Sequence, residues 1–165
     1  MIPLAILTCG GTFDKVYYDA LSDYSIGAPC APDLLAEAGM QDGWELIEVM
    51  RKDSLDMTDD DRQTLRTAAA SCRASRLVVI HGTDTMAESA AVLADIPEKT
   101  IVLTGAMSPA RFRQTDAPFN LGFAIGAALT AGHGTYIAMG GRLYPHDEVR
   151  KNRKQGRFEP TTPAS

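Results

Sequence analysis

The fold is decided by a stretch near the start of the chain, Ala5-Ile6-Leu7-Thr8-Cys9-Gly10-Gly11-Thr12. A short apolar run followed by two glycines is typical of a buried strand that ends in a sharp turn. Glycine adopts positive φ angles, which lets the backbone of such a turn approach a ligand closely. Thr12 would then project from the carboxyl end of the strand, where open α/β sheets bind ligands. An ordinary strand-to-loop turn has the same pattern, so this stretch alone does not distinguish it from a ligand-binding turn.

Strands and helices alternate along the remainder of the chain. Strands are predicted over residues 3–8, 44–50, 77–80, 100–104 and 134–139. Helices are predicted over 32–39 and 116–131. Two more are predicted to begin at Thr58, a capping residue, and at Thr85, which has capping-box spacing to Glu88. The alternation predicts an α/β fold with a doubly wound, mainly parallel sheet, helices on both faces and right-handed crossovers.

Two segments lack a periodic pattern. Residues 13–31 are polar and predict a long loop, which in a compact domain is either functional or disordered. Residues 139–165 predict a partly irregular tail whose many basic side chains are mostly solvated. The 165 residues are enough for one domain with a proper core, so we expect a single domain over 1–165 and no C-terminal domain.

Composition narrows the function and the location. A formal net charge of −5 argues against a general nucleic-acid binder, and no apolar run approaches membrane-spanning length. Three cysteines, Cys9, Cys30 and Cys72, form no even disulfide framework, which indicates a reducing compartment. The chain begins with a strand rather than a signal-peptide pattern. We therefore expect a cytoplasmic protein without nucleic-acid or membrane partners.

Hydroxyl and carboxyl side chains follow three of the predicted strands, at Thr12, at Asp53 and Ser54, and at Thr83 and Asp84. The carboxyl ends of parallel strands share one sheet edge, so these groups should meet there. The set suggests catalysis by a threonine nucleophile, which is weak and needs a base or a charged relay. The glycine-rich turns could supply N–H groups for an oxyanion hole.

Other polar residues have simpler explanations. His81 stands at a strand end before Gly82 and is interpreted as a hydrogen-bonded structural residue. The acidic run 59–61 could suggest a metal site, but negative side chains in the first turn of a helix are sufficiently explained by the helix dipole. We predict neither a metal nor another cofactor.

A series of motifs stands in collinear order over most of the chain: Gly10-Gly11-Thr12, Tyr24-Ser25-Ile26-Gly27, Ser54-Leu55-Asp56-Met57, His81-Gly82-Thr83-Asp84-Thr85-Met86, Thr104-Gly105-Ala106-Met107, Pro109 and Asp116-Ala117-Pro118-Phe119-Asn120-Leu121. In these motifs the chain resembles the bacterial-type L-asparaginases and glutaminases, which are threonine-dependent amidohydrolases. The motif at 81–86 is the most specific. The resemblance is to the N-terminal domain of that family.

The resemblance implies catalytic roles. Thr12 would be the nucleophile that attacks the side-chain amide, and Tyr24 the loop tyrosine that activates it. Thr83, Asp84 and Lys151 would form the second triad of the family, in which the lysine eases deprotonation of Thr83 or of a bridging water. The lysine is assigned from the pattern at 147–151 alone, where two basic neighbours, Arg150 and Lys154, are the competing assignments.

The resemblance also implies substrate contacts. The N–H groups of Gly11 and Thr83 would form the oxyanion hole. Ser54 would hold the α-carboxylate of the substrate, and Asp84 its α-ammonium. One position departs from the family, because Leu55 stands where a glutamine is usual and cannot accept a hydrogen bond from an ammonium.

Family enzymes also carry a C-terminal domain that adds an acidic residue to the site of a neighbouring subunit, and we expect no such domain here. A domain normally covered in this way should expose an apolar face, and the apolar helix 119–129 is the best candidate. We therefore expect a homo-oligomer, most simply a C2 dimer.

The leading interpretation is hydrolysis of a small amide, first of all L-asparagine. Three alternatives stay open. One is a ligand-binding or regulatory domain that has kept the fold and lost turnover. Another is an amidohydrolase for glutamine or a different amide, which Leu55 would suit. The third alternative is a thiol enzyme that uses Cys9.

Overall fold

A computed structural model describes residues 3–162. Its centre is a six-stranded sheet in the order β4-β1-β5-β6-β7-β8. All neighbours in this sheet are parallel except the last pair, β7 and β8. The strands are β1 (Leu4–Gly10), β4 (Trp44–Lys52), β5 (Arg76–Ile80), β6 (Thr100–Thr104), β7 (Gly134–Met139) and β8 (Arg142–Pro145). The predicted mainly parallel α/β sheet is thus confirmed.

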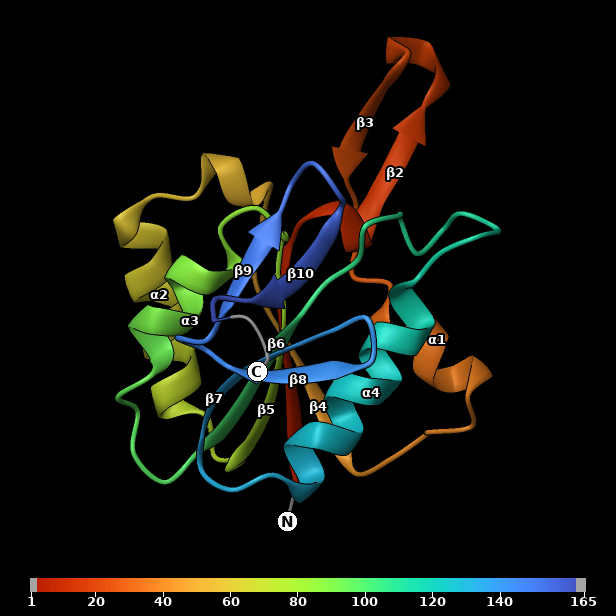
Figure 1. Cartoon of the computed structure of the whole chain (residues 1–165). Helices are drawn as coiled ribbons and strands as arrows, with labels where there is room; N and C mark the ends of the chain where they lie inside the picture. The colour runs from red at the N-terminus through yellow and green to blue at the C-terminus, as the bar shows by residue number, and fades with distance from the viewer. Residues whose placement is uncertain (1–2, 163–165) are drawn as a thin grey trace.

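Helices cover both faces of the sheet (Figure 1). One face packs against α1 (Ala31–Glu37) and α4 (Ala117–Thr130), and the other against α2 (Asp59–Ser71) and α3 (Met86–Leu93). Successive side chains of β1 alternate between the two layers: Leu4 and Ile6 join the first core, and Ala5 and Leu7 the second. Because both faces are covered, the central strands are continuous apolar runs.

Residues 13–31 are more regular than the predicted loop. They form a hairpin of β2 (Lys15–Tyr18) and β3 (Asp23–Ile26), which projects beyond the sheet at its carboxyl edge (Figure 1). Two 3₁₀ turns, η1 (Thr12–Asp14) and η2 (Asp19–Leu21), flank and close it. Its side chains are largely exposed, so the alternation of buried and exposed residues that reveals a strand is missing here.

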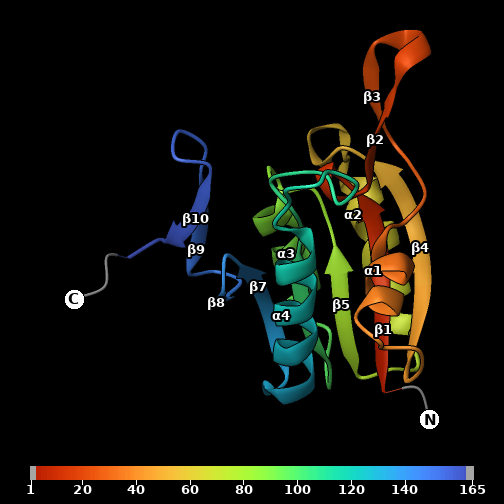
Figure 2. The same cartoon turned by 90° about the vertical axis from the view of Figure 1, so that its right-hand side faces the viewer.

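The predicted irregular tail also contains strands. After β8, a second hairpin pairs β9 (Val149–Asn152) with β10 (Arg157–Pro160) and stands apart from the helical layers (Figure 2). Each strand has four residues, and buried positions are few, namely Tyr144, Val149 and Phe158. Such short strands give almost no periodic signal, which explains why the sequence pattern missed them.

The two predicted helix caps have different outcomes. Thr58 accepts a hydrogen bond from the Asp61 N–H at 3.2 Å, and the Asp61 carboxylate accepts one from the Thr58 N–H at 2.8 Å. This capping box places the acidic run of α2 at the helix start, as predicted. The capping box predicted at Thr85 is wrong, because its hydroxyl instead donates to the carbonyl oxygen of Ser54 at 2.8 Å.

Within residues 3–162, no helix combines the length and the apolar character that a membrane crossing requires. The longest helix, α4, has 14 residues. A helix of that length rises about 21 Å, which is shorter than the hydrocarbon core of a bilayer.

Candidate active site

Three turns meet at the carboxyl edge of the sheet, and glycines allow them to touch. Gly11 has a φ of 78°, and a Cβ atom at that position would lie 2.5 Å from the Cα of Gly82. A Cβ on Gly82 would in turn lie 2.7 Å from Ser54. Only glycine fits such approaches without displacing the backbone. The turns after β1, β4 and β5 therefore bring Thr12, Ser54 and Thr83 to one place.

Lys151 joins this edge from a distant part of the chain. Its Nζ atom donates to Thr83 Oγ1 at 2.7 Å and to Asp84 Oδ1 at 2.8 Å, across 68 and 67 residues of sequence. The lysine side chain is 16% exposed and that of Asp84 28%. A partly buried ammonium group on a hydroxyl oxygen stabilises negative charge on that oxygen, so this contact favours deprotonation of Thr83 or of a water beside it.

The neighbours of Lys151 have other partners. Arg150 pairs with Glu159, with 2.9 Å between Nη2 and Oε1, and lines a cleft of about 780 Å³ that includes none of Thr12, Ser54 or Thr83. Consecutive residues of a strand point to opposite sides, which explains the contrast with Lys151. Lys154 lies in the turn of the hairpin and has no ion pair among residues 3–162. The geometry thus favours Lys151 among the three cations.

Thr12 opens the first 3₁₀ turn and is partly exposed. Among the described residues, neither its hydroxyl nor its N–H group has a hydrogen-bond partner, and the same holds for the N–H of Thr83. Gly11 differs, because its N–H donates to the carbonyl oxygen of Lys52 at 3.0 Å. This backbone donor is already engaged, which contradicts its predicted place in the oxyanion hole.

Tyr24 is not brought to Thr12. It lies on β3 of the projecting hairpin, is 47% exposed, and packs against Tyr17 and Phe112 with ring centroids 5.1 and 6.1 Å away. In the described part of the chain no hydrogen bond links it to Thr12. The base of the hairpin is fixed, since Arg111 donates to the carbonyl oxygens of Asp14 and Ala28 at 3.0 and 2.9 Å.

Ser54 and Leu55 form a small 3₁₀ turn after β4, and they differ in burial. Ser54 is 1% exposed, and its hydroxyl oxygen accepts a hydrogen bond from the Thr85 N–H at 3.3 Å. Leu55 is 62% exposed. The turn is held by Asp53, whose carboxylate accepts from the Leu55 N–H at 3.0 Å. This turn therefore has a buried hydroxyl at Ser54 and a solvent-exposed apolar side chain at Leu55.

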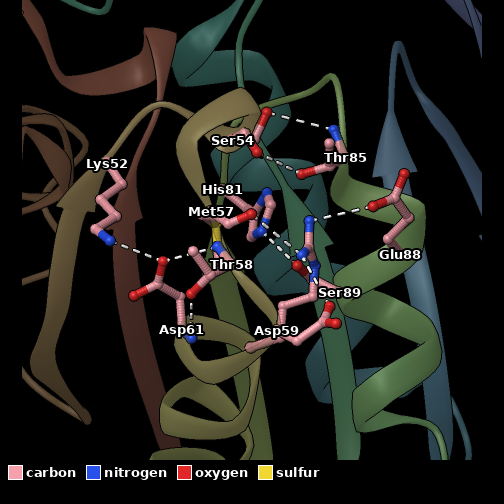
Figure 3. Close-up of polar contacts among 11 residues, drawn as sticks. Lys52, Ser54, Met57, Thr58, Asp59, Asp61, His81, Thr85, Glu88 and Ser89 are labelled. Carbon is pink, nitrogen blue, oxygen red and sulfur yellow. Dashed lines mark hydrogen bonds and ion pairs between the residues drawn. The ribbon is translucent and has the colours of Figure 1, made fainter.

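A polar network lies beneath these turns (Figure 3). His81 is fully buried, with its ring nitrogens 2.6 Å from the Gly82 carbonyl oxygen and 2.7 Å from Ser89 Oγ. Burial lowers the pKa of His81 to about 4, so the ring is neutral at physiological pH. The predicted structural role of His81 is confirmed, and the network fixes the turn that carries Thr83.

Arg62 is a second buried polar side chain near His81, and the sequence pattern did not reveal it. It is 6% exposed and donates to the carbonyl oxygen of Met57 at 3.3 Å and to Glu88 at 3.2 Å. It therefore ties the turn after β4 to the start of α3. The available signal was its spacing, since Arg62 shares the buried side of α2 with Leu65 and Ala69.

The alternative that uses Cys9 as a nucleophile is not supported. The thiol is fully buried between the sheet and the helices, and this burial raises its pKa to about 12. Only the thiolate form is a good nucleophile, and it is scarce at such a pKa. Residues 3–162 also contain no group of three or more histidine, cysteine or acidic side chains arranged to hold a metal ion.

The asparaginase N-terminal family model matches residues 3–159. The chain belongs to the asparaginase family. Among curated relatives of this family, a probable periplasmic L-asparaginase of Haemophilus influenzae is 36% identical over 112 residues, which are 63% of this chain and 32% of that protein. An L-asparaginase of Thermococcus kodakarensis is 31% identical over 162 residues, covering 90% of this chain and 47% of that one.

Solved structures of asparaginases share the fold. The thermostable L-asparaginase of Thermococcus kodakarensis superimposes with a TM-score of 0.83 at 28% identity, over 95% of this chain and 50% of that one. A probable cytoplasmic L-asparaginase of Campylobacter jejuni gives 0.80 at 26% identity, over 97% and 54%. This chain thus spans between a third and about half the length of the asparaginases it matches.

Proposed function

We propose that this chain hydrolyses the side-chain amide of a small substrate, first of all L-asparagine, to a carboxylate and ammonia. The observation that carries the proposal is the contact of Lys151 with both Thr83 and Asp84, beside the turn that presents Thr12. A hydroxyl nucleophile and a charged relay on one sheet edge are what amide hydrolysis by a threonine needs. Membership of the asparaginase family supports the same reaction.

In the proposed mechanism, Thr12 Oγ attacks the amide carbon while its proton passes, through Thr83 or a bridging water, to the departing nitrogen. Ammonia leaves, and water then hydrolyses the acyl-threonine. Lys151 favours the deprotonated state of Thr83, and Asp84 holds the lysine in place. Direct attack by a water that the same groups activate would give the same products.

The oxyanion of the tetrahedral intermediate requires N–H donors that are not already bonded. The N–H groups of Thr12 and Thr83 meet this requirement among the described residues, whereas that of Gly11 does not. We therefore propose Thr12 and Thr83 as the oxyanion donors. Gly11 contributes by its positive φ, which lets its turn approach Gly82.

Tyr24 and Ser54 complete the proposal. Tyr24 would reach Thr12 only if the hairpin of β2 and β3 bent toward the site, about the base that Arg111 fixes. Ser54 would bind the α-carboxylate of the substrate through its hydroxyl, whose oxygen also accepts from the Thr85 N–H. Leu55 lies on the exposed side of this turn, which also suits a less polar amide than asparagine.

Ammonia release from L-asparagine, L-glutamine and a few other amides tests the proposal. Thr12→Ala should reduce release by about 1,000-fold or more, because loss of a nucleophile removes the main route of catalysis. Thr130→Ala is the matched control, since this exposed threonine at the end of α4 touches no part of the site. A folded Thr12→Ala variant with turnover within a few-fold of the wild type would refute the nucleophile.

The same panel separates the rival function. A ligand-binding or regulatory domain would bind an amide or its acid without releasing ammonia from any of the compounds. The hydrogen-bonded set of Thr83, Asp84 and Lys151 favours the enzyme, because a binding domain has no need of a lysine on a threonine hydroxyl.

A cytoplasmic location is part of this proposal. Three cysteines, Cys9, Cys30 and Cys72, are free in the structure, as expected for a reducing compartment. Relatives are described for both compartments, one as periplasmic and one as cytoplasmic. Fractionation of the source cells would decide between them.

A further inference from the structure

Asp84 faces two cations rather than one. Its Oδ1 atom is 2.8 Å from Lys151 Nζ and 3.3 Å from Arg153 Nε. The two cations differ in exposure, since the Lys151 side chain is 16% exposed and that of Arg153 64%. Arg153 lies in the turn that follows β9, and its side chain is the more exposed of the two cations on Asp84.

This arrangement changes the charge that a substrate meets. One carboxylate opposed by two cations leaves a net charge of +1 in the group of Asp84, Lys151 and Arg153. A third cation brought to Asp84, such as the ammonium group of an amino acid, would have to approach two like charges. The nearby rim offers no compensation at Leu55, which is exposed and apolar and has no acceptor atom in its side chain. A carboxylate, by contrast, gains from the additional positive charge.

We propose that Arg153 determines specificity at this site by sharing Asp84 with Lys151, which disfavours an ammonium group on the substrate. The site then accepts amides that carry a carboxylate but no free ammonium, the monoamides of dicarboxylic acids, better than it would with Lys151 as the sole partner of Asp84. This inference rests on the proposed amide hydrolysis. It assigns Arg153 a role in substrate choice and none in bond cleavage.

Binding of L-aspartate and succinate, measured by isothermal titration calorimetry, tests the inference directly. The two acids correspond to the products of amide hydrolysis and differ only in the ammonium group. In Arg153→Gln the affinity for L-aspartate should rise relative to that for succinate by about two- to five-fold, as expected for the loss of one exposed charge. Arg153→Lys retains the charge and should keep most of the wild-type ratio.

The matched control is Arg150→Gln. Arg150 is on the same hairpin and is 67% exposed, almost as Arg153 is, but it pairs with Glu159 instead of Asp84. Its loss lowers the net charge equally and should leave the ratio of the two affinities unchanged. Added salt should reduce the effect of Arg153→Gln, because the interaction is close to solvent.

Turnover gives a second readout. The ratio of kcat/KM for L-asparagine to that for succinamate should rise about two- to five-fold in Arg153→Gln, through a lower KM for asparagine with kcat nearly constant. A structural defect would instead lower kcat for both amides.

The outcomes separate the inference from the proposed function. An unchanged affinity ratio in Arg153→Gln, an equal change in Arg150→Gln, or no binding of either acid to the wild type would overturn the role of Arg153. The expected shift in binding without ammonia release from any amide would support Arg153 and refute the proposed hydrolysis.

Discussion

At the scale of single residues, the site depends on side chains whose partners are remote in sequence. Lys151 reaches Thr83 and Asp84 across 68 and 67 residues, while its neighbour Arg150 points to the other side of β9. A sequence motif can identify the residue types, but only the fold chooses one cation among several adjacent ones.

Replacing Lys151 by methionine should reduce ammonia release far more than replacing Lys154. Methionine fills a similar volume, so Lys151→Met removes the ammonium charge beside Thr83 without leaving a large void. We expect a loss of about 100-fold or more, the usual contribution of a group that assists proton transfer. Lys154 lies in the exposed turn of the hairpin, and Lys154→Met should change turnover less than two-fold, as is common for exposed charges. Equal losses in the two variants would remove Lys151 from the mechanism.

His81 should make stability depend on pH. Burial lowers its pKa to about 4 in the folded state, whereas an unfolded histidine titrates near 6.5. The unfolded chain therefore binds the proton first, and the free energy of unfolding should fall as pH decreases from about 6.5 to 4, by up to about 3 kcal/mol. Urea unfolding across this range measures the slope. His81→Gln should flatten it, even if it lowers stability overall.

His133→Gln is the control for this experiment, because His133 is exposed in the turn before β7. Carboxylates also titrate in this range, so the comparison of slopes between the two variants isolates the buried ring. A slope that is the same in wild type and His81→Gln would show that His81 does not titrate on unfolding as its burial implies.

The sequence identified most of the residues at the site, but not the use of their backbone groups. Thr12, Ser54, Thr83 and Asp84 were found because a parallel sheet gathers the carboxyl ends of its strands. The direction of the Gly11 N–H was not predictable in this way. The pairing of β1 with β4 shifts in register between Thr8 and Gly10, and this irregularity directs the next N–H to Lys52.

At the scale of elements, long buried segments were predicted well and short exposed ones poorly. The central strands and α2 carry strong patterns, since burial on both faces or a capping residue marks them. The two hairpins have strands of four residues, mostly exposed, whose pairing follows from tertiary position. The prediction of a capping box for α3 was wrong for a related reason, because the Thr85 hydroxyl donates to Ser54, a partner that no local pattern reveals.

The capping box of α2 permits a prediction about helix stability. Thr58→Ala removes the acceptor for the Asp61 N–H and should lower the free energy of unfolding by about 1 kcal/mol. Thr64→Ala is the control, because Thr64 is exposed in the interior of α2 and, among residues 3–162, its hydroxyl bonds only to the Asp60 carbonyl of the same helix. Urea denaturation measures both. A loss in Thr64→Ala as large as in Thr58→Ala would mean that the cap adds nothing.

At the scale of the whole molecule, the sheet and its two helical layers followed from the alternation of elements, whereas assembly does not follow from it. A single domain over residues 1–165 and a homo-oligomer both stay predictions. The helix proposed as the contact, α4, packs one side on the sheet through Leu121, Ala124 and Ala128. Its other side is open, as Figure 2 shows for the whole length of the helix.

The open side of α4 is apolar, with glycines between its large side chains. Phe119 is 63% exposed and Leu129 45%, and a Cβ on Gly122 or Gly126 would meet no atom within 4 Å. Small residues between large apolar ones allow two helices to approach closely, and proteins seldom leave such a surface uncovered. A C2 dimer that pairs two copies of α4 is the simplest closed arrangement that covers it.

Sedimentation velocity at micromolar concentration should therefore give a dimer, and Phe119→Glu should shift it to the monomer, because the charge would be buried at the contact. Tyr18→Glu is the matched control, since this tyrosine is 49% exposed on the projecting hairpin, away from α4 (Figure 1). It should leave the dimer intact. A wild-type protein that sediments as a monomer with full turnover would refute both the contact and any need for a second copy at the site. Dissociation by Tyr18→Glu but not by Phe119→Glu would move the contact from α4 to the hairpin.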